Sequence, residues 1–202
     1  MLKYSDIDPH KDAFIFELDN VLYPEKDYLF QIYYLFTALL EYAHLVDAKE
    51  ATDFMIQTYL SEGKDVVFDN LRKKFNFGEK YRYNFKLLNN TARLPLKLLL
   101  YPEMLSLLQE IVVDRKKIFI VTNGNPEQQL NKIKQTEWNG LEPYLTCYFA
   151  EEIASKPAVD CIDLLIKDHY LQRNNILMIG NSHIDEDCAI ACDIDYVSVN
   201  GF

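Results

Sequence analysis

The sequence predicts an α/β fold, a three-layer doubly wound parallel sheet with an inserted α-helical domain. From residue 101 onward, segments of helical periodicity alternate with short apolar runs, which is typical of a parallel sheet covered by helices. Residues 25–95 break this alternation, since their patterns are helical and no strand signal separates them. We therefore predict a core domain of residues 1–24 and 96–202 and a helical domain of residues 25–95.

The predicted strands are short apolar runs that end in small or polar residues, as buried parallel strands do. They are the start of "AFIFELDNVLYPEKDY" (13–28), "KIFIVTNGN" (117–125), "TCYFA" (146–150), "NILMIGNSH" (175–183) and "YVSVNGF" (196–202). In an open parallel sheet, ligands bind beyond the carboxyl ends of the strands. Polar residues that follow these runs are therefore candidates for a functional site.

The helices of the core domain are predicted from their start signals. Pro102, Pro126 and Pro157 stand where a first helical residue is expected, in the segments 101–112, 125–138 and 156–170. In the inserted domain, helical patterns cover the segments from residue 25 to about 75, and Tyr33, Tyr34 and Phe36 are expected in its core rather than in a ligand site.

Composition and charge exclude several functions. A net charge of -10 and a pI near 4.9 oppose nucleic-acid binding, which depends on clustered lysine and arginine. A small phosphorylated metabolite remains compatible, because a divalent cation bridges carboxylates and phosphate. No apolar stretch approaches the roughly 20 residues of a membrane span, and the first residues lack a signal-peptide centre, so we predict no membrane association and a cytoplasmic location. The four cysteines are expected as separate thiols.

The polar residues at the predicted strand ends form a chemically coherent set. They supply acids for a hard cation, a hydroxyl and backbone N–H groups for an oxyanion, and a lysine to balance negative charge. The set comprises Glu17, Asp19, Thr122, Asn123, Gly124, Lys156, Asn181, Ser182, Asp185, Glu186 and Asp187.

Four of these segments, "ELDNV", "IVTNG", "SKP" and "GNSHID", resemble in their order and spacing the four motifs of the haloacid dehalogenase (HAD) superfamily. A helical cap between the first and second motifs is also a trait of that superfamily. The resemblance implies a magnesium-dependent, phosphatase-like hydrolase of a small phosphate monoester, such as a nucleotide or sugar phosphate, with the substrate bound between core and cap. Asp19 argues against the branch that removes halides, which differs at this position and uses no magnesium.

The resemblance also implies roles for individual residues. Glu17 matches the nucleophile that attacks phosphorus, and Asp19 matches the residue that protonates the leaving alcohol and then activates water. Lys156 would offset the charge shared by nucleophile and phosphate. The phosphoryl oxygens would be held by Thr122, Asn123 and Gly124.

Magnesium would be held, by the same resemblance, at Glu17, the backbone carbonyl of Asp19, and the acidic loop at Asn181 and Asp185. The spacing leaves open whether Asp185, Glu186 or Asp187 faces the metal. A solvated loop and helix start is the alternative for these three acids, and His183 is expected to be solvated rather than bound to a ligand.

Two acidic positions of the family pattern are changed in this chain. Glu17 replaces the nucleophilic aspartate, which moves the carboxylate outward, and a misplacement of about 1 Å costs on the order of 10²-fold in rate. Asn181 replaces the first acid of the last motif and removes a negative charge from the metal site. A second hypothesis follows: a catalytically impaired HAD-fold protein that binds a phosphometabolite or a partner protein.

Overall fold

The computed structural model describes residues 2–44 and 46–199. It divides into two compact units, which we call the core unit (Met1–Glu25 with Leu98–Phe202) and the helical unit (Lys26–Lys97). The predicted domain boundaries, 24/25 and 95/96, lie within two residues of these. Among the described residues, no helix combines the length and the apolar character that crossing a bilayer requires.

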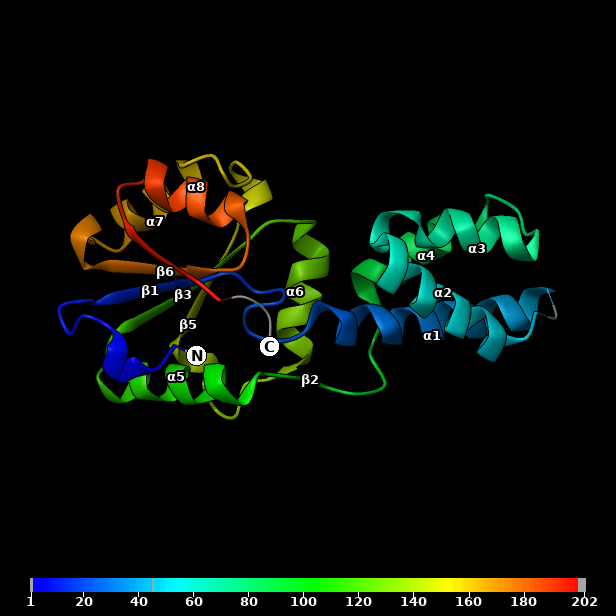
Figure 1. Cartoon of the computed structure of the whole chain (residues 1–202), viewed down its shortest axis with the longest axis horizontal. Helices are drawn as coiled ribbons and strands as arrows, with labels where there is room; N and C mark the ends of the chain where they lie inside the picture. Colours follow the sequence, from blue (N-terminus) through cyan, green and yellow to red (C-terminus); the bar gives the residue numbers. More distant parts are fainter. Residues whose placement is uncertain (1, 45, 200–202) are drawn as a thin grey trace. The chain divides into compact units, whose positions relative to one another are not determined.

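The core unit is built on a five-stranded parallel sheet with the order β5-β3-β1-β6-β7 (Figure 1). The strands are β1 (Ala13–Phe16), β3 (Lys117–Thr122), β5 (Leu145–Phe149), β6 (Ile176–Gly180) and β7 (Asp195–Ser198). Two short strands, β2 (Leu98–Leu99) and β4 (Thr136–Glu137), pair separately. The predicted doubly wound parallel sheet is confirmed. The last predicted strand starts one residue earlier than expected, and its residues 200–202 lie outside the described residues.

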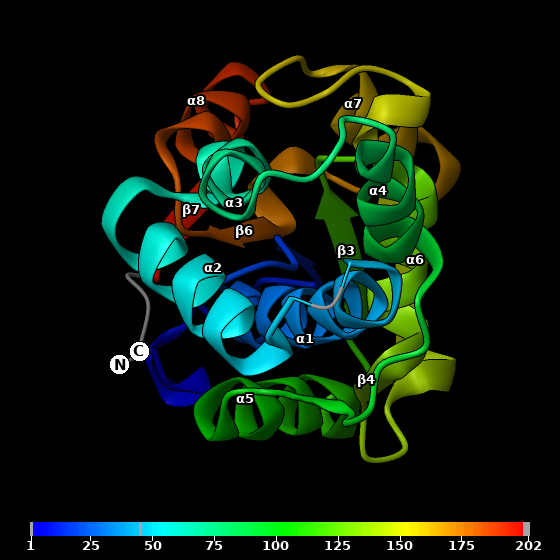
Figure 2. The same ribbon diagram turned by 90° about the vertical axis from the view of Figure 1, so that its right-hand side faces the viewer.

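Helices cover both faces of this sheet, giving three layers (Figures 1 and 2). On one face lie α5 (Pro102–Val113) and α6 (Pro126–Gln135), and on the other α7 (Asp160–Asp168) and α8 (His183–Ala191). The second face buries alternate strand residues such as Ile15, Val121 and Met178 against the two helices. Short 3-10 turns complete the unit at Tyr4–Asp6, Glu142–Tyr144, Ala150–Glu152 and Arg173–Asn175.

The start signals were correct for two of the three helices. Pro102 and Pro126 are the first residues of α5 and α6. The prediction for Pro157 was wrong, because α7 begins only at Asp160. The side chain of Asn123 binds both the backbone N–H and the backbone carbonyl of Lys156, each at 2.9 Å, and this holds the chain before Pro157 in a turn. Similarly, α6 ends at Gln135 because the next two residues form β4.

The helical unit consists of α1 (Glu25–His44), α2 (Ala48–Glu62), a 3-10 turn (Lys64–Val66), α3 (Val67–Phe75) and α4 (Tyr81–Thr91). Its core is aromatic. The ring centroid of Phe36 lies 4.9 Å from that of Phe85 and 5.9 Å from that of Phe68. Tyr33 and Phe36 are buried as predicted, but Tyr34 is 57% exposed. The buried residues of α1 form a stripe at helical spacing, and Tyr34 lies outside that stripe.

Candidate functional site

The carboxyl ends of three strands bring the site residues of the core unit together. Phe16, the last residue of β1, pairs with Ile120 on one side and Ile179 on the other. Glu17 follows directly and donates its N–H to the carbonyl of Ile179 at 3.0 Å. Thr122 is the last residue of β3. The parallel register therefore places residues far apart in the sequence at one edge of the sheet.

A buried lysine joins two of the predicted acids. The Lys156 ammonium donates to Glu17 Oε2 at 2.5 Å and to Asp185 Oδ1 at 2.6 Å. Its third proton goes to the backbone carbonyl of Val121 at 3.0 Å. Burial lowers the pKa of Lys156, but the two carboxylates outweigh this effect and leave the pKa raised. The lysine is therefore a fixed positive charge that uses all three of its donors.

Glu17 has an oxygen atom available for reaction. Oε1 accepts two hydrogen bonds, from the Thr122 hydroxyl at 2.5 Å and from the N–H of Leu18 at 2.7 Å. Among the residues that the structure describes, Oε2 accepts one hydrogen bond, from Lys156, and a carboxylate oxygen has two lone pairs. Burial raises the pKa of the Glu17 carboxyl, against the opposing effects of Lys156 and Thr122. One lone pair of Oε2 therefore has no hydrogen-bond donor among the described residues.

Of the three acids in the last motif, Asp185 is the one that enters the site. It is buried, whereas Glu186 and Asp187 are exposed. Its Oδ2 accepts from the Ser182 hydroxyl at 2.7 Å and from the N–H groups of Ser182 and Asn181 at 3.2 and 3.3 Å. Burial would raise the pKa of Asp185, but Lys156 and these donors hold it below its ordinary value.

Asp19 lies two residues after Glu17 and has its own set of partners. Its Oδ1 accepts from the Tyr23 hydroxyl at 2.7 Å, and its Oδ2 accepts from Lys132 Nζ at 2.6 Å and Gln129 Nε2 at 3.1 Å. Burial alone would raise the pKa of Asp19, but the Lys132 ammonium and the two hydrogen-bond donors hold it below its ordinary value. Asp19 is therefore held as an ionised carboxylate by Lys132, Tyr23 and Gln129.

Asn123 and Gly124, which were expected to hold phosphoryl oxygens, have hydrogen-bond partners within the protein. The Asn123 side chain forms hydrogen bonds with the backbone N–H and carbonyl of Lys156. The Gly124 N–H donates to the carboxylate of Glu151 at 3.1 Å, and φ of +103° at this residue suits glycine. An anionic substrate that uses this N–H must displace Glu151.

The predicted magnesium ligands offer the chemistry that this ion prefers. Carboxylate, backbone carbonyl and amide oxygens are hard donors, and Glu17, Asp19, Asn181 and Asp185 supply all three kinds. Within residues 2–44 and 46–199, however, no group of three or more His, Cys, Asp or Glu side chains is placed to hold a metal. Magnesium needs only one or two carboxylates when water and a substrate phosphate complete its shell. The donor set fits magnesium as a partial shell of this kind.

Three residues that contact the predicted acids were not identified from the sequence: Tyr23, Gln129 and Lys132. Gln129 and Lys132 are both 2% exposed on α6, while Leu130 beside them is 40% exposed. A usable signal was the spacing of three residues between two long polar side chains, in a helix that starts directly beyond a strand end.

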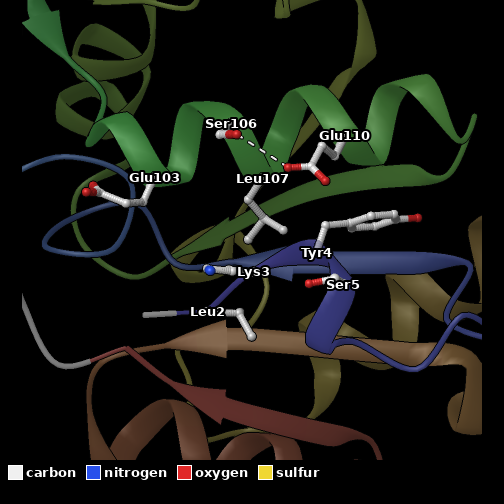
Figure 3. A pocket seen from close by; sticks show the side chains of 8 residues that line it. All are labelled: Leu2, Lys3, Tyr4, Ser5, Glu103, Ser106, Leu107 and Glu110. Carbon is white, nitrogen blue, oxygen red and sulfur yellow. Dashed lines mark hydrogen bonds between the residues drawn. The ribbon is translucent and has the colours of Figure 1, made fainter.

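The core unit also has a cavity of about 330 Å³ away from these acids, between the N-terminal segment and α5 (Figure 3). Its lining includes Lys3, Tyr4, Glu103 and Glu110 and none of the predicted site residues. The Tyr4 hydroxyl donates to Asp114 at 2.6 Å. These contacts fasten the N-terminal segment to α5.

Comparison with known proteins identifies the family. A family profile described as haloacid dehalogenase-like hydrolase matches residues 14–199. The chain belongs to the HAD-like hydrolases. The carboxylates at the strand ends and the buried lysine thus belong to a protein of a hydrolase family. A search of curated protein sequences finds no match.

Solved structures of HAD-like hydrolases share the fold. A hydrolase from Streptococcus pneumoniae TIGR4 is 15% identical, with a TM-score of 0.59 over 96% of this chain and 95% of that one. The HAD-hydrolase YfnB from Bacillus subtilis, solved bound to magnesium, is 15% identical, with a TM-score of 0.62 over 94% and 86%. L-2-haloacid dehalogenase from Xanthobacter autotrophicus is 16% identical, with a TM-score of 0.53 over 94% and 77%. At these identities the likeness establishes the fold alone.

Proposed function

We propose that this HAD-like hydrolase cleaves small phosphate monoesters through a carboxyl-phosphate on Glu17. The observation that carries the proposal is the environment of the Glu17 carboxylate: Oε1 is fixed by Thr122, and Oε2 is held by Lys156 with a lone pair remaining. A carboxylate oriented in this way beside a buried cation suits attack on phosphorus, where alignment and charge stabilisation supply most of the catalysis.

The first step is a displacement at phosphorus. Asp19 enters this step protonated, as the second step of the preceding cycle leaves it. Glu17 Oε2 forms the new bond to phosphorus, the bond from phosphorus to the ester oxygen breaks, and the carboxyl proton of Asp19 passes to the leaving oxygen. Lys156 remains beside Oε2 and offsets the negative charge that the phosphoryl group brings. Thr122 holds Oε1, so the carboxylate cannot rotate away.

The second step releases phosphate. Asp19 accepts a proton from a water molecule as the water oxygen attacks phosphorus, and the bond between phosphorus and Glu17 breaks, which regenerates the carboxylate. Glu17, the Asp19 backbone carbonyl, Asn181 and Asp185 would hold magnesium, which when bound would neutralise phosphoryl charge. Support for magnesium comes from the hard oxygen donors of this set and from its use by a structural neighbour.

Two observations favour the phosphate ester over a halogenated acid. Asp19 places a second carboxylate two residues after the nucleophile, where proton transfer to and from an ester oxygen is useful. The same carboxylate is bound by three donors, so it is held in place instead of pointing freely into solvent.

The test is release of inorganic phosphate from p-nitrophenyl phosphate and a panel of nucleotide and sugar phosphates, with and without magnesium. The native protein is compared with Glu17→Gln and Glu17→Asp. Turnover by the native protein that Glu17→Gln abolishes supports the proposal. Turnover by Glu17→Asp alone contradicts it, and would favour the alternative of an impaired relative that binds a phosphometabolite or a partner protein.

A further inference from the structure

Helix α6 carries two buried polar side chains that the proposed chemistry leaves unexplained. Gln129 and Lys132 are one helical turn apart, each 2% exposed, and they are the buried residues of this helix. Long polar side chains are rarely buried unless their partners require it. Both of these bind the same oxygen, Asp19 Oδ2.

The orientation of the Gln129 carboxamide is decided by its neighbours. Its Nε2 lies 3.1 Å from Asp19 Oδ2, 2.7 Å from Thr122 Oγ1 and 2.9 Å from the carbonyl oxygen of Asn123. The carboxylate and the carbonyl only accept hydrogen bonds, so the nitrogen must face them. Its Oε1 is consequently buried without a hydrogen-bond partner among the described residues. A buried acceptor without a partner destabilises the fold. The hydrogen bonds that Gln129 Nε2 donates must therefore offset the destabilisation that comes from Oε1.

The contacts form a continuous chain between the two predicted catalytic acids. Gln129 Nε2 donates to Asp19 and also to Thr122 Oγ1. Because Thr122 accepts from Gln129, its own proton is left to donate to Glu17 Oε1, at 2.5 Å. One carboxamide therefore influences the position of both carboxylates.

We propose that Gln129 and Lys132 are the positioning residues of this site, fixing the Asp19 carboxylate directly and the Glu17 carboxylate through Thr122. The inference rests on the proposed function and deepens it. A glutamate has one more rotatable bond than an aspartate, so its carboxylate needs more external restraint to stay aligned. The side chains of Gln129 and Lys132, which we call the α6 clamp, supply that restraint together with Lys156.

The test compares kinetics of p-nitrophenyl phosphate hydrolysis for Lys132→Met, Gln129→Met, Lys132→Arg and two controls. Lys134→Met and Gln172→Met change exposed residues of the same unit. Misplacement of a carboxylate by about 1 Å costs on the order of 10²-fold. We expect kcat to fall by that factor in both methionine variants with KM changed less than about three-fold, partial recovery in Lys132→Arg, and native values in both controls.

A structural readout keeps this inference separate from the proposed function. Crystal structures of Lys132→Met and Gln129→Met are compared with the native protein at the Asp19 and Glu17 carboxylates. If the native protein releases no phosphate, the proposed function fails, while a displaced carboxylate still supports the clamp. Carboxylates that stay in place, or methionine variants with native kcat, overturn it. Should Lys132→Met fail to fold, Gln129→Met decides, because it removes no charge and eliminates the unpaired Oε1.

Discussion

Gly180 ends β6 at a place where no side chain fits. A Cβ atom built there would lie 2.6 Å from Asp185 Cβ, 2.8 Å from its Cγ and 2.8 Å from its Oδ2. Contacts under 3.0 Å force atoms to move, and Asp185 is only 2% exposed and held by Lys156 and Ser182. Gly180→Ala must therefore displace either β6 or the buried ion pair.

The expected loss follows from these two routes. Overpacking of a dense interior costs about 1–3 kcal/mol, and separation of a buried ion pair costs about 3–5 kcal/mol. The cheaper route sets the outcome, so we expect the free energy of unfolding to fall by about 1–3 kcal/mol. For a chain of 202 residues, this corresponds to a melting temperature lower by roughly 2–12 °C.

The assay is urea unfolding followed by the fluorescence of Trp138. This is the single tryptophan of the chain, and it is 2% exposed in the core unit, so its signal reports the unit that contains the change. Gly78→Ala is the control for a tolerated change of glycine to alanine, since among the described residues its new Cβ would meet Lys80 Cγ alone, at 3.7 Å. Gly78 lies in the helical unit, so the unfolding of both variants is also followed by far-UV circular dichroism. We expect that control to stay within about 0.5 kcal/mol.

A second variant checks the cause of the loss. Because the nearest atom to the new Cβ is Asp185 Cβ, Asp185→Ala leaves that contact in place, and only Asp185→Gly removes it. Gly180→Ala should therefore cost less in the Asp185→Gly background than in the native protein. A loss below about 1 kcal/mol in the single variant, or an equal loss in both backgrounds, would refute the steric argument.

Three further predictions concern charge. Asn181→Asp restores a negative charge at the predicted metal site, so magnesium should bind about ten-fold more tightly and raise the melting temperature further; an unchanged magnesium shift would contradict the assignment. Glu151→Gln weakens the competitor for the Gly124 N–H, so KM for phosphate esters should fall about two- to five-fold, whereas Glu152→Gln should not change it. Burial and Asp114 raise the pKa of Tyr4 to about 12. The stabilisation from this tyrosine is therefore complete below about pH 10 and is lost as the pH rises toward 12. Accordingly, the difference in urea midpoint between the native protein and Tyr4→Phe should narrow from pH 9 to pH 11.5, and a constant difference would contradict the shift.

The sequence by itself determined the fold and the location of the candidate acids. Alternating helical and strand periodicities predict a parallel sheet. Each periodicity is a spacing between residues close together in the sequence, so it can be recognised without knowing the tertiary structure. Parallel strands end at one edge of the sheet, so the sequence alone predicts that Glu17, Thr122 and Lys156 lie close together. Proline marked the starts of α5 and α6 for the same local reason, since its fixed φ suits the first turn of a helix.

Tertiary structure decided which polar side chains are buried and what they bind. The burial of Gln129 and Lys132 depends on an acid 110 or more residues away in the sequence. The choice of Asp185 over Glu186 and Asp187 depends on Lys156 and on the space left by Gly180. Long side chains lose conformational entropy and hydration on burial, and only partners fixed by the whole fold offset that cost. Local patterns contain no record of those partners, so the burial of these polar side chains could not be predicted from the sequence.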